Sequence, residues 1–118
     1  MPRMKRHLAE SINLGEFEQL VLITAMRLGN EAYSAAIQAE IEKRGGRPAS
    51  VSAVYTTLER LEIKGLVRSR VGEPTPQRGG KRKKHYEVTP AGTRAVQDAY
   101  QLLKRMTKGM ESMLEKAR

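Results

Sequence analysis

The segment from residue 51 to residue 86 constrains the fold of this chain more than any other. It begins with V-S-A-V-Y-T-T-L-E-R-L, in which apolar side chains recur at three- and four-residue steps, the pattern of an amphipathic helix. Two strand-like segments follow, R-S-R-V and H-Y-E-V, joined by a long loop rich in glycine, proline and basic residues. This order predicts a recognition helix followed by a β-wing, and it favours a DNA-binding module over an enzyme.

Two further helices are predicted before this segment. The first covers about Gly15 to Leu28, where apolar residues surround most of the circumference and predict a helix buried inside the domain. The second covers about Tyr33 to Lys43 and ends at two glycines. Ser50 is placed to cap the recognition helix. The buried face predicted for that helix consists of Val51, Val54, Leu58 and Leu61.

A long terminal helix is predicted from about Ala91 to Lys116, opened by Thr89 as cap and Pro90 in the first turn. Its length would be roughly 39 Å at 1.5 Å per residue, more than three short helices can cover. We therefore expect it to pair with the same helix of a second subunit. The predicted dimer interface consists of Val96, Ala99, Tyr100, Leu103, Met106, Met110 and Met113. A methionine stripe is also typical of a cavity for a hydrophobic ligand, but the dimer core is the favoured interpretation.

Charge and composition narrow the classes of function. The net charge of +9 favours a polyanionic partner. The chain has no cysteine, which excludes disulfides and thiolate zinc sites and fits the cytoplasm. His7 and His85 are far apart and have no neighbouring nucleophile, so we expect no catalytic residue, cofactor or metal site. No segment approaches the roughly 18–20 apolar residues that a bilayer requires, so no membrane association is expected.

The predicted DNA contacts come from three places in the sequence. Small hydroxyls on a helix allow close approach to base edges, and cations neutralise phosphates. The contacts are Tyr33 and Ser34 at the start of the second helix; Ser50, Ser52, Tyr55, Thr56 and Arg60 along the recognition helix; and Arg78, Lys81, Arg82, Lys83 and Lys84 in the wing. A solvated helix face, a disordered basic loop and a core role for Tyr33 are the alternatives. The basic tract Arg3, Lys5 and Arg6 is interpreted as a frayed terminus.

Four segments, in this order, resemble the PadR-type transcriptional regulators, in particular the short forms with one C-terminal helix. They are L-G-E-F-E-Q-L-V-L at 14–22, N-E-A-Y-S at 30–34, the helix and turn at 51–67, and G-E-P-T-P-Q-R-G-G-K-R-K-K-H-Y-E-V-T-P-A-G at 72–92. The resemblance implies a mainly helical α+β fold, a winged helix-turn-helix with a long C-terminal dimerisation helix. It also implies a homodimer that represses transcription at an inverted-repeat operator, with Tyr33, Tyr55 and the basic wing on the DNA.

Two departures from the family pattern bear on DNA recognition. Many members have proline where this chain has Thr56, and glycine where it has Ser34. The first affects base preference and the second the approach of the local backbone. Some members bind phenolic acids or flat drugs, and the absence of tryptophan weakens that expectation for this chain.

The predicted organisation has three parts: a basic tail at 1–13, a winged helix-turn-helix domain at 14–89 and a dimerisation helix at 90–118. The leading hypothesis is a dimeric, sequence-specific DNA-binding regulator that acts on double-stranded DNA. One alternative is a small-molecule sensor with its ligand cavity at the dimer interface. The other is a winged helix that binds an acidic protein through its wing.

Overall fold

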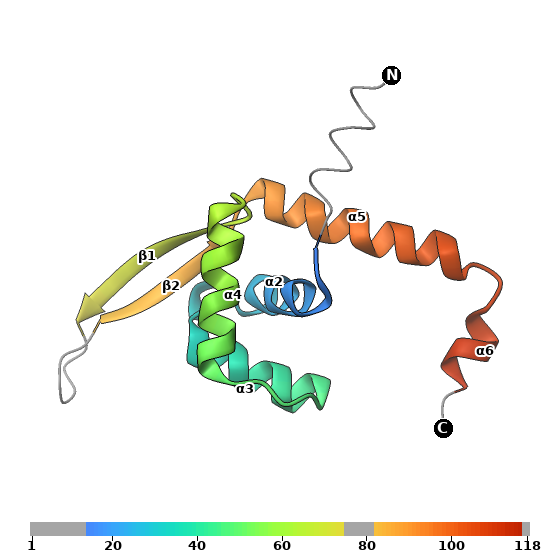
Figure 1. Cartoon of the computed structure of the whole chain (residues 1–118), viewed down its shortest axis with the longest axis horizontal. Helices are drawn as coiled ribbons and strands as arrows, with labels where there is room; N and C mark the ends of the chain where they lie inside the picture. Colours follow the sequence, from blue (N-terminus) through green and yellow to red (C-terminus); the bar gives the residue numbers. More distant parts are fainter. Residues whose placement is uncertain (1–13, 75–81, 117–118) are drawn as a thin grey trace, which may run out of the picture.

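A computed structural model of the chain describes residues 14–74 and 82–116. Three helices and a short 3₁₀ turn form a compact helical body: α2 (Glu16–Leu28), η1 (Gly29–Glu31), α3 (Ser34–Gly45) and α4 (Val51–Ile63). An antiparallel ribbon of β1 (Val67–Pro74) and β2 (Arg82–Val88) extends from one side, and α5 (Pro90–Thr107) with the short α6 (Glu111–Glu115) extends from the other (Figure 1). The architecture is the predicted winged helix-turn-helix.

The core lies where α2, α3 and α4 meet the base of the ribbon. The largest fully buried side chains are Tyr86, Leu22, Ile37, Leu58, Leu61, Val21 and Val54. The prediction that α2 is buried inside the domain was wrong for one of its faces, because Ile23 and Met26 are 41% and 40% exposed. Val51 was also misplaced, since it is 44% exposed in the first turn of α4. Three short helices cover only the faces that they turn toward one another.

Side-chain caps set the start of α4 and of α5, as the sequence predicts. The Ser50 hydroxyl accepts a hydrogen bond from the Ala53 amide at 3.1 Å, and the Thr89 hydroxyl accepts one from the Gly92 amide at 3.1 Å. Each bond satisfies an amide that the helix itself leaves without a partner. A side chain of α3 stabilises the turn before α4: Gln38 Nε2 donates a hydrogen bond to the Ala49 carbonyl at 2.9 Å.

The wing strands are longer than predicted. The sequence placed residues 71–84 in a loop, but β1 continues to Pro74 and β2 begins at Arg82, with a register shift between Val71 and Pro74. Gly72 allows this extension, because a side chain there would lie 3.3 Å from the His85 ring. The paired strands of the ribbon, its stem, therefore carry part of the basic segment.

The terminal helix is not the single helix predicted for 91–116. It ends at Thr107, turns through Lys108 and Gly109, and resumes as α6. Gly109 has φ of 91°, a conformation that glycine adopts readily and other residues do not. The Gly109 amide donates to Glu111 Oε1 at 3.0 Å, which fixes the turn. The break divides the predicted dimer stripe between two helices.

The start of α5 is fastened closely to the turn that follows α4. The Thr89 amide donates to the Leu66 carbonyl at 3.0 Å, and the Thr89 hydroxyl donates to the Gly65 carbonyl at 2.8 Å. Gly92 lies directly on this turn, because a Cβ there would overlap the Leu66 carbonyl oxygen and lie 2.8 Å from Val88 Cγ1. Helix α5 thus leaves the body from a rigid junction.

Candidate nucleic-acid interface

The exposed face of α4 carries most of the predicted base-reading residues. Ser52, Tyr55, Thr56 and Glu59 are exposed, whereas Val54, Thr57 and Leu58 are buried. Tyr55 is 39% exposed, and its pKa is raised by a hydrogen bond to Glu59 and by the negative charge of that carboxylate. The side chain is therefore accessible, with an acidic neighbour one turn further along the helix.

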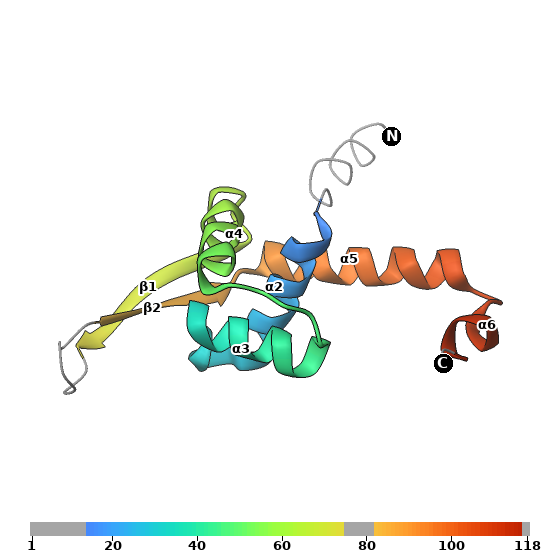
Figure 2. The same cartoon turned by 60° about the horizontal axis from the view of Figure 1, so that its bottom comes forward.

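Strand β2 turns successive side chains to opposite sides, as a strand must. Lys84 and Tyr86 lie on the side of α4, and Lys83 and His85 lie on the side of Tyr33. Figure 2 shows this sandwich, with α4 above the base of the ribbon and α3 below it. One short stretch of β2 thus contacts both helices of the helix-turn-helix.

On the α4 side, one lysine lies between two aromatic rings. Lys84 Nζ is 5.7 Å from the centre of the Tyr55 ring and 5.8 Å from that of Tyr86. An ammonium group within about 6 Å of a ring face is attracted by the ring quadrupole. The contact links the wing to the exposed face of the recognition helix.

On the other side, Tyr33 pairs with the wing in two ways. Its backbone forms a single antiparallel bridge with His85, and the two rings meet edge to face with their centres 5.5 Å apart. Lys83 Nζ lies 4.2 Å from the centre of the Tyr33 ring. Tyr33 is half-buried at the start of α3. This burial fits both the predicted surface role and the alternative of a core residue with its hydroxyl at the surface.

His85 and Tyr86, the two aromatic residues of β2, each have a buried polar atom. Tyr86 is 2% exposed, and its hydroxyl has no hydrogen-bond partner among the described residues. His85 Nδ1 is likewise buried and without a hydrogen-bond partner there. Burial raises the pKa of Tyr86 to about 12, with smaller contributions from Tyr55, Glu59 and Glu62. The Tyr86 hydroxyl therefore stays protonated and remains a hydrogen-bond donor at neutral pH.

The structure brings some of the predicted DNA contacts together and separates others. Lys83 with Tyr33 and Lys84 with Tyr55 form two pairs on opposite sides of β2, which together we call the tyrosine–lysine cluster. Arg60 lies elsewhere, close enough to Glu18 of α2 to lower the pKa of that carboxyl. The remaining predicted wing contacts fall outside what can be placed: Arg78 and Lys81 lie outside the described residues, and only the backbone of Arg82 is described.

Sequence reasoning missed the partners of these residues. Ser50 was predicted both as the cap of α4 and as a DNA contact; its hydroxyl oxygen forms the cap, and the DNA contact stays a prediction. Glu59 was recognised as exposed, but not as the partner of Tyr55. The signal available in the sequence was the run K-K-H-Y, whose alternation assigns 83 and 85 to one side and 84 and 86 to the other once the strand is known to include them.

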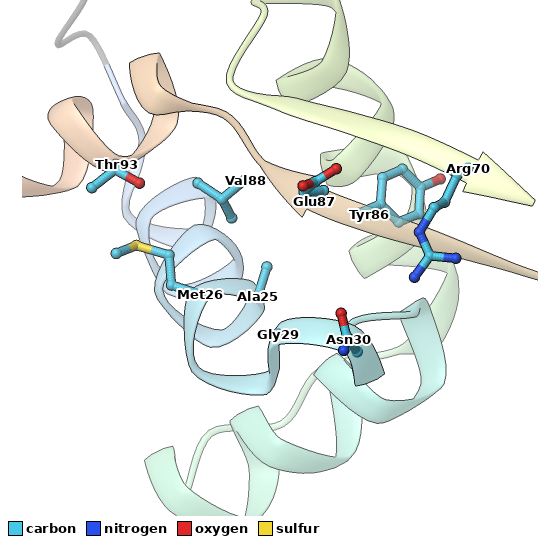
Figure 3. Close-up of a pocket in the computed structure, with 9 residues that line it drawn as sticks. All are labelled: Ala25, Met26, Gly29, Asn30, Arg70, Tyr86, Glu87, Val88 and Thr93. Atoms are coloured by element: carbon cyan, nitrogen blue, oxygen red, sulfur yellow. The ribbon is translucent and has the colours of Figure 1, made fainter.

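A separate cavity of about 410 Å³ lies behind the ribbon, between α2, η1, β2 and the start of α5 (Figure 3). Ala25, Met26 and Val88 line one end, and Arg70 and Asn30 line the other. The lining includes none of the methionines of the terminal helices. In the described part of the chain, no three histidine, cysteine or acidic side chains are placed to share a metal ion, and no helix has the length and hydropathy to cross a membrane.

The apolar stripe of α5 and α6 is largely uncovered within one chain. Met106 is 69% exposed, and Tyr100, Leu103, Met110 and Met113 are also exposed. The N-terminal part of the predicted interface differs from this stripe. Val96 packs partly against the core of its own chain, and Ala99 is half-buried. The exposed apolar surface therefore begins near Tyr100 and continues along the arm that points away from the body (Figure 1).

Comparison with known proteins places this fold in a family. A crystal structure of a PadR family transcription regulator from Clostridium difficile R20291 is 22% identical, covers 85% of this chain and 99% of its own, and superposes with a TM-score of 0.65. The PadR family transcriptional regulator of Eggerthella lenta DSM 2243 is 26% identical over 83% of each chain, with a TM-score of 0.61. Bacillus subtilis PadR in complex with operator DNA is 21% identical and superposes with a TM-score of 0.57, over 72% of this chain and 46% of that one. A comparison with curated protein sequences gave no match. The model of the transcriptional regulator PadR-like family matches residues 22–98, well over half of the chain, and the chain therefore belongs to that family.

Proposed function

We propose that this chain is a sequence-specific DNA-binding repressor that acts as a homodimer on an inverted-repeat operator. The observation that carries the proposal is the tyrosine–lysine cluster. Through it the stem of the wing contacts the start of α3 on one side and the exposed face of α4 on the other, with a lysine at each contact. An ordinary solvated helix face does not require such contacts between three separate elements.

The exposed face of α4 has the shape and chemistry for the major groove. Ser52 and Thr56 are short and exposed, so the helix backbone can approach the base edges, and their hydroxyls donate or accept there. Lys84 lies beside this face and Lys83 lies on the other side of β2, next to the start of α3, and their ammonium groups meet the flanking phosphates. The tyrosine rings hold the lysine side chains in place, which reduces the conformational entropy that they lose on binding.

The exposed stripe of the terminal arm supports the homodimer. A run of apolar side chains of this length is unusual on the surface of a soluble monomer, and a second copy of the same helix covers it. A two-fold axis between the arms would place two α4 helices in successive major grooves, roughly 34 Å apart. The relative from Bacillus subtilis was crystallised on operator DNA, which supports the same use of the fold here.

Selection of bound sequences from random duplex DNA at physiological salt tests the proposal. We expect an enriched inverted repeat with half-sites about one helical turn apart. The matched variant is Tyr55→Ala, which should lose the enrichment while it keeps its fold and its general affinity for DNA. Enrichment of no sequence by the unmodified protein, with binding that disappears as the salt concentration rises, would refute the proposal.

A hydrophobic small-molecule effector is a second candidate, supported by the methionines of the arm. Met110 immediately precedes α6 and Met113 lies on it, both beyond the break at Gly109, and flexible thioether side chains adapt to varied apolar ligands. We expect saturable binding of a hydrophobic dye by the unmodified protein and its loss in Met110→Lys. Equal dye binding by both proteins would exclude a ligand site at this stripe.

A further inference from the structure

The first two turns of α4 present an uncharged surface on a strongly basic chain. From Val51 to Leu58 the helix has no charged side chain, and its charges begin at Glu59 and Arg60. The exposed residues of these turns are Val51, Ser52, Ala53, Tyr55 and Thr56. Methyl and hydroxyl groups therefore dominate the end of the helix that, in helix-turn-helix proteins, contacts base edges.

Val51 is the apolar side chain at the start of this surface. It is 44% exposed, although the sequence placed it in the core. Alanine would favour the helix more, so helix formation does not account for a valine at an exposed position. A single exposed valine is ordinary on a protein surface. This one, however, lies one turn before Tyr55 and next to Ser52, on the face of α4 that we assign to DNA.

The backbone that leads into Val51 is fixed to α3. The Ala49 carbonyl accepts a hydrogen bond from Gln38 Nε2 at 2.9 Å, and the Ala49 amide donates one to Glu42 Oε2 at 3.2 Å. Ser50 then caps the helix. The position of Val51 is therefore set before DNA binds, and a β-branched side chain has few rotamers to lose. A contact by its methyl groups costs little conformational entropy.

A methyl group distinguishes thymine from the other bases in the major groove. Thymine carries this methyl at C5, where cytosine has only a hydrogen, and apolar side chains contact it. Such a contact removes the methyl group and the side chain from water together. Among the exposed residues of the first turn of α4, Val51 has the largest apolar side chain, since its neighbours are Ser52 and Ala53.

We propose that Val51 is a specificity-determining residue whose methyl groups pack on the 5-methyl group of a thymine in each half-site. This inference rests on the proposed function and adds the identity of one base to it. Lys84, beside Tyr55, is assigned to phosphate, which carries no sequence information. Discrimination between bases therefore falls to the uncharged turns of α4.

Replacement of thymine by deoxyuridine tests the contact, because it removes only the 5-methyl group and keeps the base pair. Each thymine of the selected operator is replaced in turn, in both half-sites at once, and affinity is measured by fluorescence anisotropy. For the unmodified protein, one such position should lower the affinity by about fifteenfold, or roughly fourfold for each methyl group. Val51→Ala should bind the thymine operator more weakly and should not distinguish thymine from deoxyuridine at that position.

Ile63→Ala is the matched control for the loss of exposed apolar surface. Ile63 is 86% exposed at the opposite end of α4, so this variant should keep the full preference for thymine. Val51→Thr is a second test variant, which preserves the shape of the side chain and exchanges one methyl group for a hydroxyl. It should lose part of the preference. Circular dichroism checks that each variant keeps its helices.

The outcomes separate this inference from the proposed function. A preference for thymine that persists in full in Val51→Ala would assign the methyl contact to another residue and overturn the inference. A selected operator in which no thymine differs from deoxyuridine would also overturn it, and would leave the proposed function intact. Failure of the unmodified protein to select any sequence would refute the proposed function and the thymine contact together.

Discussion

The salt dependence of DNA binding gives a quantitative test of the wing stem. Lys83 and Lys84 are the described wing lysines, and each is held against a tyrosine ring, at 4.2 Å and 5.7 Å from Nζ to the ring centre. If each contacts one phosphate, the double variant Lys83→Ala and Lys84→Ala removes about four contacts per dimer. Each phosphate contact contributes about −0.9 to the slope of log K against log salt, so the slope should become less negative by about 3.6.

This change in slope is large enough to measure. Between 50 and 200 mM salt, the unmodified protein should lose roughly 150-fold more affinity than the double variant. Fluorescence anisotropy of a labelled duplex at several salt concentrations gives the slope directly. The loss should be similar for the operator and for unrelated DNA, because phosphates carry no sequence information.

Lys43→Ala is a suitable control for the loss of charge. Lys43 lies in the last turn of α3, at the end of that helix that points away from the wing (Figure 1). We expect this variant to keep the full slope. If the double variant also keeps the full slope, Lys83 and Lys84 do not contact phosphate, and the cluster loses its assigned role in DNA binding.

Three further predictions concern the fold and the dimer. Gly92→Ala should destabilise the chain by about 1–3 kcal/mol in urea unfolding, because the new Cβ meets the Leu66 carbonyl and neither backbone segment can give way; unchanged stability would contradict this packing. Met106→Glu should yield a folded monomer by sedimentation, since the side chain is 69% exposed in one chain, and an intact dimer would place the interface elsewhere. Burial alone would raise the pKa of Glu18, but its hydrogen bonds, including that from Lys64 at 3.0 Å, lower it below 4.5. The resulting stability is present above pH 4.5 and is lost as the pH falls through the lowered value, so Tm should fall there, and Glu18→Gln should flatten that fall.

The elements and their order were predictable because their signals are local. Ser50 and Thr89 cap the helices that the sequence assigned to them, and each cap depends only on the next few residues. The break at Gly109 was missed because a single glycine in a strongly apolar helical pattern does not by itself end a helix.

The partners within the site were beyond local reasoning. Lys83 and Tyr33 are 50 positions apart in the sequence, and their contact depends on the bridge between Tyr33 and His85. That bridge requires β2 to extend through residues that the sequence assigned to a loop. The sequence therefore predicted which side chains are cationic or aromatic, whereas their pairing follows from the register of a strand that only the folded chain defines.

The junction at Gly92 makes α5 a stiff lever attached to the recognition helix. The 18 residues of α5 span about 27 Å at 1.5 Å per residue, so each degree of rotation at the junction moves the far end by about 0.5 Å. Thr89 fastens the short end of this lever to the turn that ends α4. In the proposed dimer, a change in the angle at which the two α5 helices cross must therefore tilt both α4 helices in their grooves. The half-site spacing that the dimer binds then depends on that crossing angle.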